Sequence, residues 1–186
     1  MKRVAALVLT AVLTTLCACS VQRFSDVKMF EKKFNKQFVS CPIDCSEAVI
    51  TEQDGELQYS FVLSPDGNKN FLICLYTQED DPRVKRCTVT ACASTDEMNG
   101  GIYSVFREIC SAVINAFSNG DDSPQEVAEL VFMPQDGEYS QSVPQYAQTI
   151  FNRYIYSADS YGAFFCVENV SLCPQETPEL TLRSGE

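Results

Sequence analysis

One amphipathic helix, expected over residues 102–117, divides this chain into two groups of strand-like segments. Its apolar positions recur at spacings of three and four residues: Ile102, Val105, Phe106, Ile109, Val113 and Phe117. A second helix is expected to begin after Ser123, because this cap residue is followed by Pro124 and, at the third helical position, by Glu126. Helices set between two groups of strands favour an α+β fold.

Turn residues cut the chain before residue 100 into short segments with strand character. The clearest segment is 57–63, where every second residue is apolar. Asp54-Gly55 precedes it and Pro65-Asp66-Gly67-Asn68 follows it, and both are turn sequences. Strands are therefore expected over residues 47–53, 57–63, 70–77 and 84–93, as an antiparallel meander.

After the helices, residues 153–158 and 163–169 are rich in aromatic and β-branched residues, which predicts a hairpin. Residues 143–151 are ambiguous, and Pro144 at their start would suit a short helix. The expected architecture is an antiparallel sheet of about five to six strands with helices packed on one face. This order of elements resembles helix-grip and TATA-binding-protein-like arrangements.

The first nineteen residues have the features of an export signal. Lys2 and Arg3 precede an apolar run over 4–16, which is shorter than the roughly 20 residues that a membrane span needs. The run ends in Leu16-Cys17-Ala18-Cys19, which resembles the lipobox of bacterial lipoproteins. The resemblance implies cleavage after Ala18, a diacylglyceryl group on Cys19 and a lipid anchor on the outer face of a membrane. The alternatives are an ordinary secretory signal, although Leu16 replaces its usual small residue, and a retained anchor.

Charge is divided unevenly along the chain beyond this signal. Residues 20–37 carry five basic and two acidic side chains, whereas residues 38–186 carry seven basic and 23 acidic ones. We expect a signal peptide over 1–18, the anchored cysteine with a basic amphipathic helix over 19–38, one α+β domain over 39–173 and a loose acidic tail over 174–186. The basic stretch would suit anionic headgroups, or it is the solvated face of a helix. An acidic body disfavours a nucleic-acid partner.

The chain contains no histidine, and this absence excludes several mechanisms. Ser-His-Asp and Cys-His catalysis in their usual forms and histidine-bound catalytic zinc all need that side chain. Phosphate-binding and nucleophile-elbow motifs are also missing from the sequence. An enzyme that uses two carboxylates stays open, since 25 acidic residues offer many pairs. Glu79-Asp80-Asp81 and Asp121-Asp122 lack EF-hand spacing and are interpreted as solvated loops, so no cofactor is expected.

Eight cysteines follow the signal, and an even number in an exported protein suggests disulfides. The local candidates are Cys41 with Cys45, on either side of Pro42, and Cys166 with Cys173. Buried free thiols and, less favoured, a four-cysteine zinc site are the alternatives. An odd separation of five residues predicts that Cys87 and Cys92 point to opposite faces of one strand.

Tyrosines in the last hairpin are the remaining candidates for a binding surface. Tyr154 and Tyr156 share one face of their strand, and Tyr161 lies in the turn that follows. An exposed face bearing Tyr154, Tyr156 and Tyr161 would suit a protein or small-molecule ligand, although cross-strand packing explains these residues equally well. The sequence thus favours a non-catalytic, lipid-anchored extracytoplasmic binding module. A carboxylate-dependent envelope hydrolase and a structural or assembly lipoprotein are the alternatives.

Overall fold

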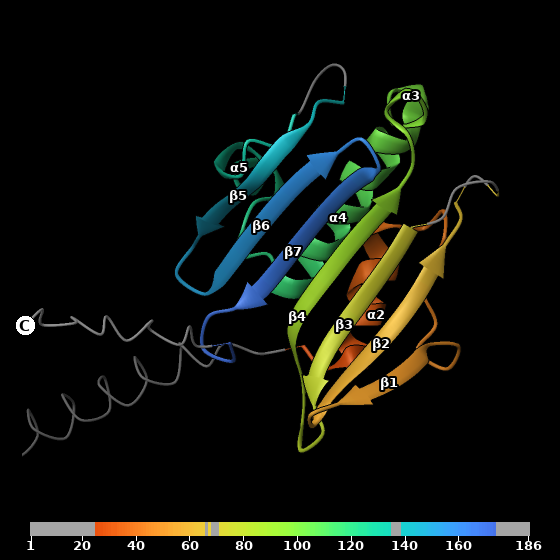
Figure 1. Ribbon diagram of the computed structural model, residues 1–186. Helices are drawn as coiled ribbons and strands as arrows, with labels where there is room; N and C mark the ends of the chain where they lie inside the picture. The colour runs from red at the N-terminus through yellow and green to blue at the C-terminus, as the bar shows by residue number, and fades with distance from the viewer. Residues whose placement is uncertain (1–24, 66, 68–70, 135–138, 174–186) are drawn as a thin grey trace, which may run out of the picture.

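Seven antiparallel strands form one sheet in the computed structural model, which describes residues 25–65, 67, 71–134 and 139–173. The strands are β1 (Val49–Gln53), β2 (Glu56–Leu63), β3 (Phe71–Gln78), β4 (Asp81–Cys92), β5 (Ser142–Gln148), β6 (Asn152–Asp159) and β7 (Gly162–Asn169). Their spatial order is β1-β2-β3-β4-β7-β6-β5 (Figure 1). The last strand in the chain therefore pairs with β4 near the centre, and β1 and β5 form the edges.

The helices of the described residues all lie on one face of this sheet (Figure 1). They are α2 (Val27–Gln37), α3 (Thr95–Glu97), the π-helical segment η1 (Met98–Ile102), α4 (Tyr103–Ser118) and α5 (Pro124–Leu130). The predicted α+β class, antiparallel sheet and one-sided helical cover are confirmed.

The expected number of strands was too low because residues 142–148 form edge strand β5 rather than a helix. Tyr146 pairs with Ile155, and Ala147 pairs with Tyr154. The register shifts between Ser142 and Gln145, around Pro144. An edge strand with a bulge tolerates a proline, since that residue has no N–H to donate to a neighbour.

Local sequence signals explain where the helices begin and end. Asp26 caps α2, where its carboxylate accepts a hydrogen bond of 2.7 Å from the Met29 amide. Ser123 caps α5, with Pro124 at its first position. Helix α4 ends at Asn119, whose backbone adopts the left-handed conformation that terminates many helices.

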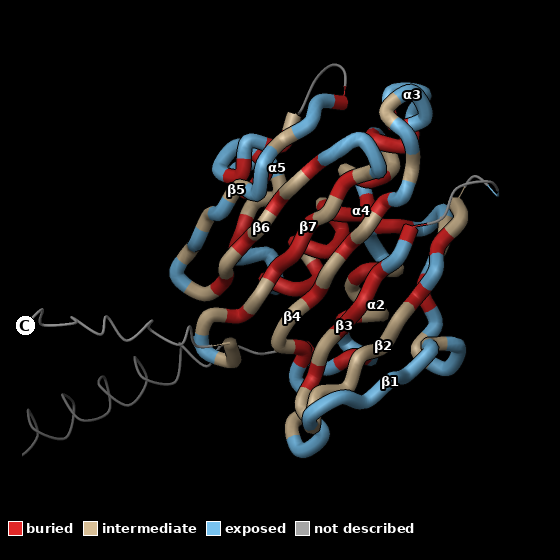
Figure 2. The backbone as a smooth tube through the Cα atoms, in the orientation of Figure 1, coloured by how far each residue is buried: buried red, intermediate tan, exposed pale blue. Residues whose placement is uncertain are grey.

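The core lies between the sheet and the helices, where the central strands and α4 are most buried (Figure 2). Phe30 and Phe34 of α2 are fully buried in this core, and α2 packs against α4. The amphipathic helix expected within residues 19–38 is α2, and it is part of the same packed body as the strands. Within the described part of the chain, no helix has the length and apolar character to cross a membrane.

Candidate functional site

The helix-free side of the sheet, here called the open face, carries alternate side chains of all seven described strands. One row of paired residues crosses it from edge to edge: Val49, Ser60, Cys74, Thr88, Cys166, Ile155 and Tyr146. Val62 and Leu72, paired with each other, are exposed on the same face. The open face therefore exposes apolar side chains on strands β1, β2, β3 and β5.

A groove of about 630 Å³ lies at the end of the open face where β4 finishes and β7 begins. We call this hollow the upper groove. Its walls are formed by Thr90–Cys92, Gln141–Pro144, Ser157–Asp159 and Tyr161–Phe164. Val143 is 73% exposed and Tyr161 is 81% exposed, so the rim presents large apolar groups to solvent. Ligand sites in proteins commonly have volumes of about 300 to 1,000 Å³, so this groove has a suitable size.

Gly162 allows the two strands at the floor of this groove to approach closely. Its φ is +146°, and a Cβ atom at this position would lie 1.8 Å from the carbonyl oxygen of Ala91. The Ala93 amide donates a 3.0 Å hydrogen bond to the Tyr161 carbonyl beside it. Only glycine meets both the steric and the backbone requirement here.

The opposite end of the open face carries a set of ion pairs, here called the charged row: Glu56, Lys85, Arg86, Arg153 and Glu168. Glu56 contacts Lys85 at 2.6 Å and Arg86 at 2.8 Å, and Glu168 contacts Arg153 at 3.0 Å. The Arg86 guanidinium also lies 4.0 Å from the centre of the Tyr76 ring. Three cations and two anions leave this row with a formal charge of +1.

Two further hollows suit a ligand less well. One, of about 560 Å³, lies on the helical side between α4 and α5 and includes Arg107 and Glu108. The other, of about 440 Å³, lies at the β1–β2 turn and is lined by polar side chains, among them Glu52, Asp54 and Lys85. The upper groove differs from both because it combines apolar walls with a place on the helix-free sheet.

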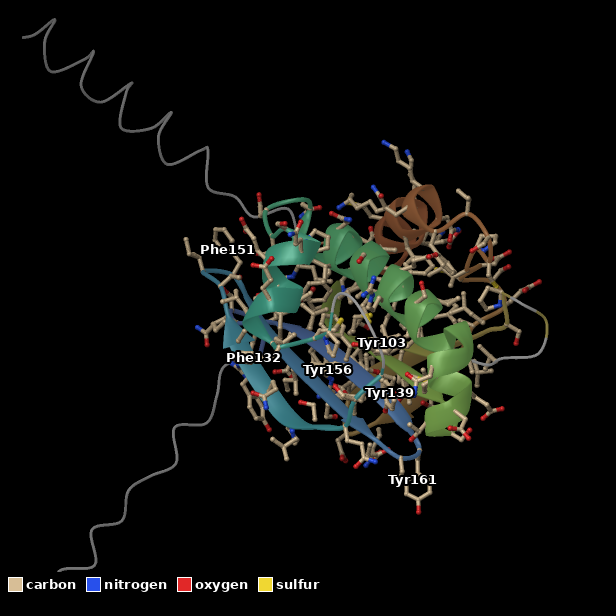
Figure 3. All side chains as sticks on the ribbon, turned by 90° about the horizontal axis from the view of Figure 1, so that it is seen from above. Tyr103, Phe132, Tyr139, Phe151, Tyr156 and Tyr161 are labelled. Carbon is tan, nitrogen blue, oxygen red and sulfur yellow. The ribbon has the colours of Figure 1, made fainter. Side chains whose placement is uncertain are left out.

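The prediction that Tyr154 and Tyr156 form an exposed binding face is wrong. Both are fully buried, since their side of β6 faces the helices. The Tyr154 hydroxyl donates to Asp122 at 2.6 Å, and the Tyr156 hydroxyl lies 3.2 Å from that of Tyr103. Figure 3 shows Tyr156 beside Tyr103 inside the protein, whereas Tyr161 projects away from it. Of the three candidates, only Tyr161 contributes to the upper groove.

The predicted disulfides are absent, because the eight cysteines that the structure describes are all free thiols. In the Cys41–Cys45 candidate, the Cys45 thiol instead donates to the Val27 carbonyl at 3.7 Å. In the Cys166–Cys173 candidate, the Cys173 thiol donates to the Lys85 carbonyl at 3.5 Å, while Cys166 is buried on the open face. The expected placement of Cys87 and Cys92 on opposite faces is confirmed, with Cys87 buried and Cys92 exposed. Cys19 lies outside the described residues.

The chemistry of two thiols, Cys45 and Cys166, does not suit a nucleophile. Burial raises the pKa of Cys45 and of Cys166 to about 12, whereas a reactive cysteine needs a lowered pKa. Among the described residues, no three Cys, Asp or Glu side chains are placed to hold a metal ion. Of the described side chains lining the upper groove, Asp159 alone is a carboxylate. The groove therefore offers shape and apolar surface rather than a paired acid and base.

Sequence reasoning missed the upper groove, because it depends on two strands that are distant in the chain. Cys92 pairs with Gly162, and Gly162 also pairs with Asp159 across the final turn. The turn itself was expected, and so was the end of the strand before residue 100. The pairing of β4 with β7, which brings these two ends together, has no local signal.

Comparisons of the chain with family models, with curated proteins and with solved structures give no match. The function is therefore inferred from the residues and their arrangement.

Proposed function

We propose that this protein is a lipid-anchored extracytoplasmic binding module, and that its open face, with the upper groove, contacts the ligand. The observation that carries the proposal is the seven-stranded sheet whose side opposite the described helices bears exposed apolar residues, among them Val62, Leu72 and Tyr146. Exposed apolar side chains such as these favour binding, because covering them with a partner removes apolar surface from water. The ligand is a protein segment or a small molecule with apolar groups.

The described chain begins at the end of the sheet opposite the upper groove. The described chain begins at Ser25, whose carbonyl accepts a 2.9 Å hydrogen bond from the Val84 amide near the start of β4. The upper groove lies at the other end of β4, beside Cys92. Eight residues of strand separate Val84 from Cys92, or about 27 Å. A protein held through Cys19 would thus direct its groove away from the membrane.

Replacing Cys19 by alanine is expected to release the protein from membranes. Acyl chains contribute about 0.8 kcal/mol per buried methylene, and the substitution removes the thiol that would carry them. The measurement is the distribution of the protein between membrane and soluble fractions after a carbonate wash. Cys17→Ala is the matched control and should stay with the membrane. Equal membrane retention of both variants would contradict the anchoring.

Photo-crosslinking from the open face tests the binding surface. A photoreactive amino acid at Val62 or Tyr146, both exposed on the open face, is expected to form specific adducts in the cell that makes this protein. The same amino acid at Leu130, which is exposed on α5, is the control and should form none. Adducts from Leu130 in place of the open-face positions would place the contact surface on the helical side and refute the proposal.

A further inference from the structure

The exposed side of α2 carries a row of three lysines, here called the lysine stripe: Lys28, Lys32 and Lys36. These residues follow one another at spacings of four, so they lie on one face of the helix. Phe30 and Phe34 lie on the opposite face, where they are fully buried in the core. The packing that fixes α2 on the protein therefore directs the three ammonium groups to solvent.

No acidic side chain neutralises the lysine stripe within the described part of the chain. None of the ion pairs found there involves Lys28, Lys32 or Lys36. The single acidic residue of the helix is Glu31, whose carboxylate instead accepts a hydrogen bond of 3.1 Å from the Cys45 amide. Like charges four residues apart destabilise a helix, and solvated helix faces commonly alternate their charges. An anionic partner would offset this repulsion.

The surroundings of the lysine stripe suit a lipid bilayer as that partner. Met29 lies one turn from Lys32 and is 41% exposed. Basic helix faces that also present apolar side chains are typical of membrane surfaces, where ammonium groups meet anionic headgroups and apolar groups insert. Ser25, at the start of the described chain, follows Cys19 by six residues. A lipid anchor on Cys19 would therefore hold the start of α2 within about 20 Å of the bilayer.

The charge of the remaining protein favours one orientation. Residues 38–186 carry 23 acidic and seven basic side chains, so an anionic surface would attract the lysine stripe and repel most of the protein. Helix α2 lies on the helical side of the sheet (Figure 1). Contact through the stripe therefore turns the open face away from the membrane.

We propose that the lysine stripe contacts the headgroups of an anionic membrane and orients the protein with its open face outward. This inference rests on the proposed function, because it starts from the lipid anchor. It adds which side of the anchored protein meets the bilayer, and it leaves the upper groove and the rest of the open face accessible to a ligand.

Thiol labelling in vesicles tests this contact. The full chain with Met29→Cys, processed in a bacterial host, is reconstituted into vesicles of phosphatidylcholine, alone or with phosphatidylglycerol at about 2:1. Mass spectrometry measures how fast a maleimide labels position 29 relative to native Cys92, which is exposed at the upper groove. Labelling at position 29 is expected to be about tenfold slower in the anionic vesicles, and high salt should remove the difference. Val62→Cys, on the open face, should be labelled equally fast in both.

Charge variants show whether the lysines cause the protection. Lys28→Gln with Lys32→Gln and Lys36→Gln should make labelling at position 29 equally fast in both kinds of vesicle, without lowering the resistance to urea. Arginine at the same three positions is the matched control, and it should keep the protection because it keeps the charge. Protection that survives in the glutamine variant would overturn the proposal. Protection in native membranes but not in anionic vesicles would also overturn it, because the partner would then not be lipid.

Flotation of the same vesicles separates this proposal from the anchoring. Protein that floats with both kinds of vesicle but is labelled equally fast at position 29 would retain the anchor and refute the stripe contact. Protein that floats only with anionic vesicles would retain the stripe contact and refute the anchor. Flotation with neither would refute both. Cross-links from Val62 or Tyr146 report on the ligand and do not depend on the stripe.

Discussion

Between pH 8 and pH 10.5, Cys87 and Cys110 alone are expected to lower the stability of the folded protein by about 4 kcal/mol. Cys87 and Cys110 are completely buried, and desolvation raises the pKa of each thiol well above the ordinary value of 9.0. Above pH 9 the unfolded chain loses these protons while the folded protein keeps them. Unfolding then releases protons, so the free energy of unfolding falls by about 1.4 kcal/mol per pH unit for each thiol.

Urea unfolding under reducing conditions at pH 8, 9, 10 and 10.5 measures this effect. A variant with Cys87→Ala and Cys110→Ala should be less stable than the wild type at pH 8. Above pH 9 its free energy of unfolding should fall less steeply than that of the wild type, by about 2.7 kcal/mol per pH unit. Cys92→Ala is the control for the loss of a thiol as such, because Cys92 is exposed. A wild type with the same stability at pH 8 and 10.5 would show that these thiols are not buried as described.

Gly162→Ala is expected to destabilise the protein by at least about 3 kcal/mol. The new methyl group would lie 1.8 Å from the Ala91 carbonyl oxygen, and the φ of +146° is one that side chains rarely adopt. Relief of the clash requires β4 and β7 to separate at the floor of the upper groove. Because these strands join the two halves of the sheet, the change weakens the centre of the fold.

The comparison for this substitution is Gly55→Ala, measured by the same urea unfolding. Gly55 also has a positive φ, of +74°, but no atom lies within 4 Å of the position where its Cβ would be. The Gly55→Ala substitution should therefore lower the free energy of unfolding by only about 1 kcal/mol, the ordinary penalty for a side chain in this conformation. Similar losses of stability in the Gly162→Ala and Gly55→Ala variants would mean that strand packing at the groove floor does not cause the destabilisation at Gly162.

Segments with strong periodicity were predictable from sequence, and segments that depend on distant contacts were not. The alternation over 57–63 and the apolar stripe over 102–117 each follow from one local rule, and both elements form. Strand β5 exists because β6 pairs with it, and its polar, half-exposed residues carry little signal of their own.

The same reason explains the error at the tyrosines. Alternation correctly placed Tyr154 and Tyr156 on one side of β6, but it could not say which side faces the helices. Asp122 and Tyr103 decide this, because they offer partners to the two hydroxyl groups from other elements. Likewise, the even number of cysteines suggested disulfides, but a number carries no information on position. The thiols instead lie where burial and their own hydrogen bonds to backbone carbonyls place them.

The pairing of β4 with β7 also dictates how this sheet can assemble. The segment between the end of β4 at Cys92 and the start of β7 at Gly162 contains both remaining strands and helices α3 to α5. This whole segment must fold back before the two central strands meet, and closing such a long loop carries an entropic cost. As the chain emerges from the ribosome, the central strand β7 appears after every other described strand of the sheet. The β1–β4 meander must therefore wait with its inner edge exposed until β7 has been synthesised.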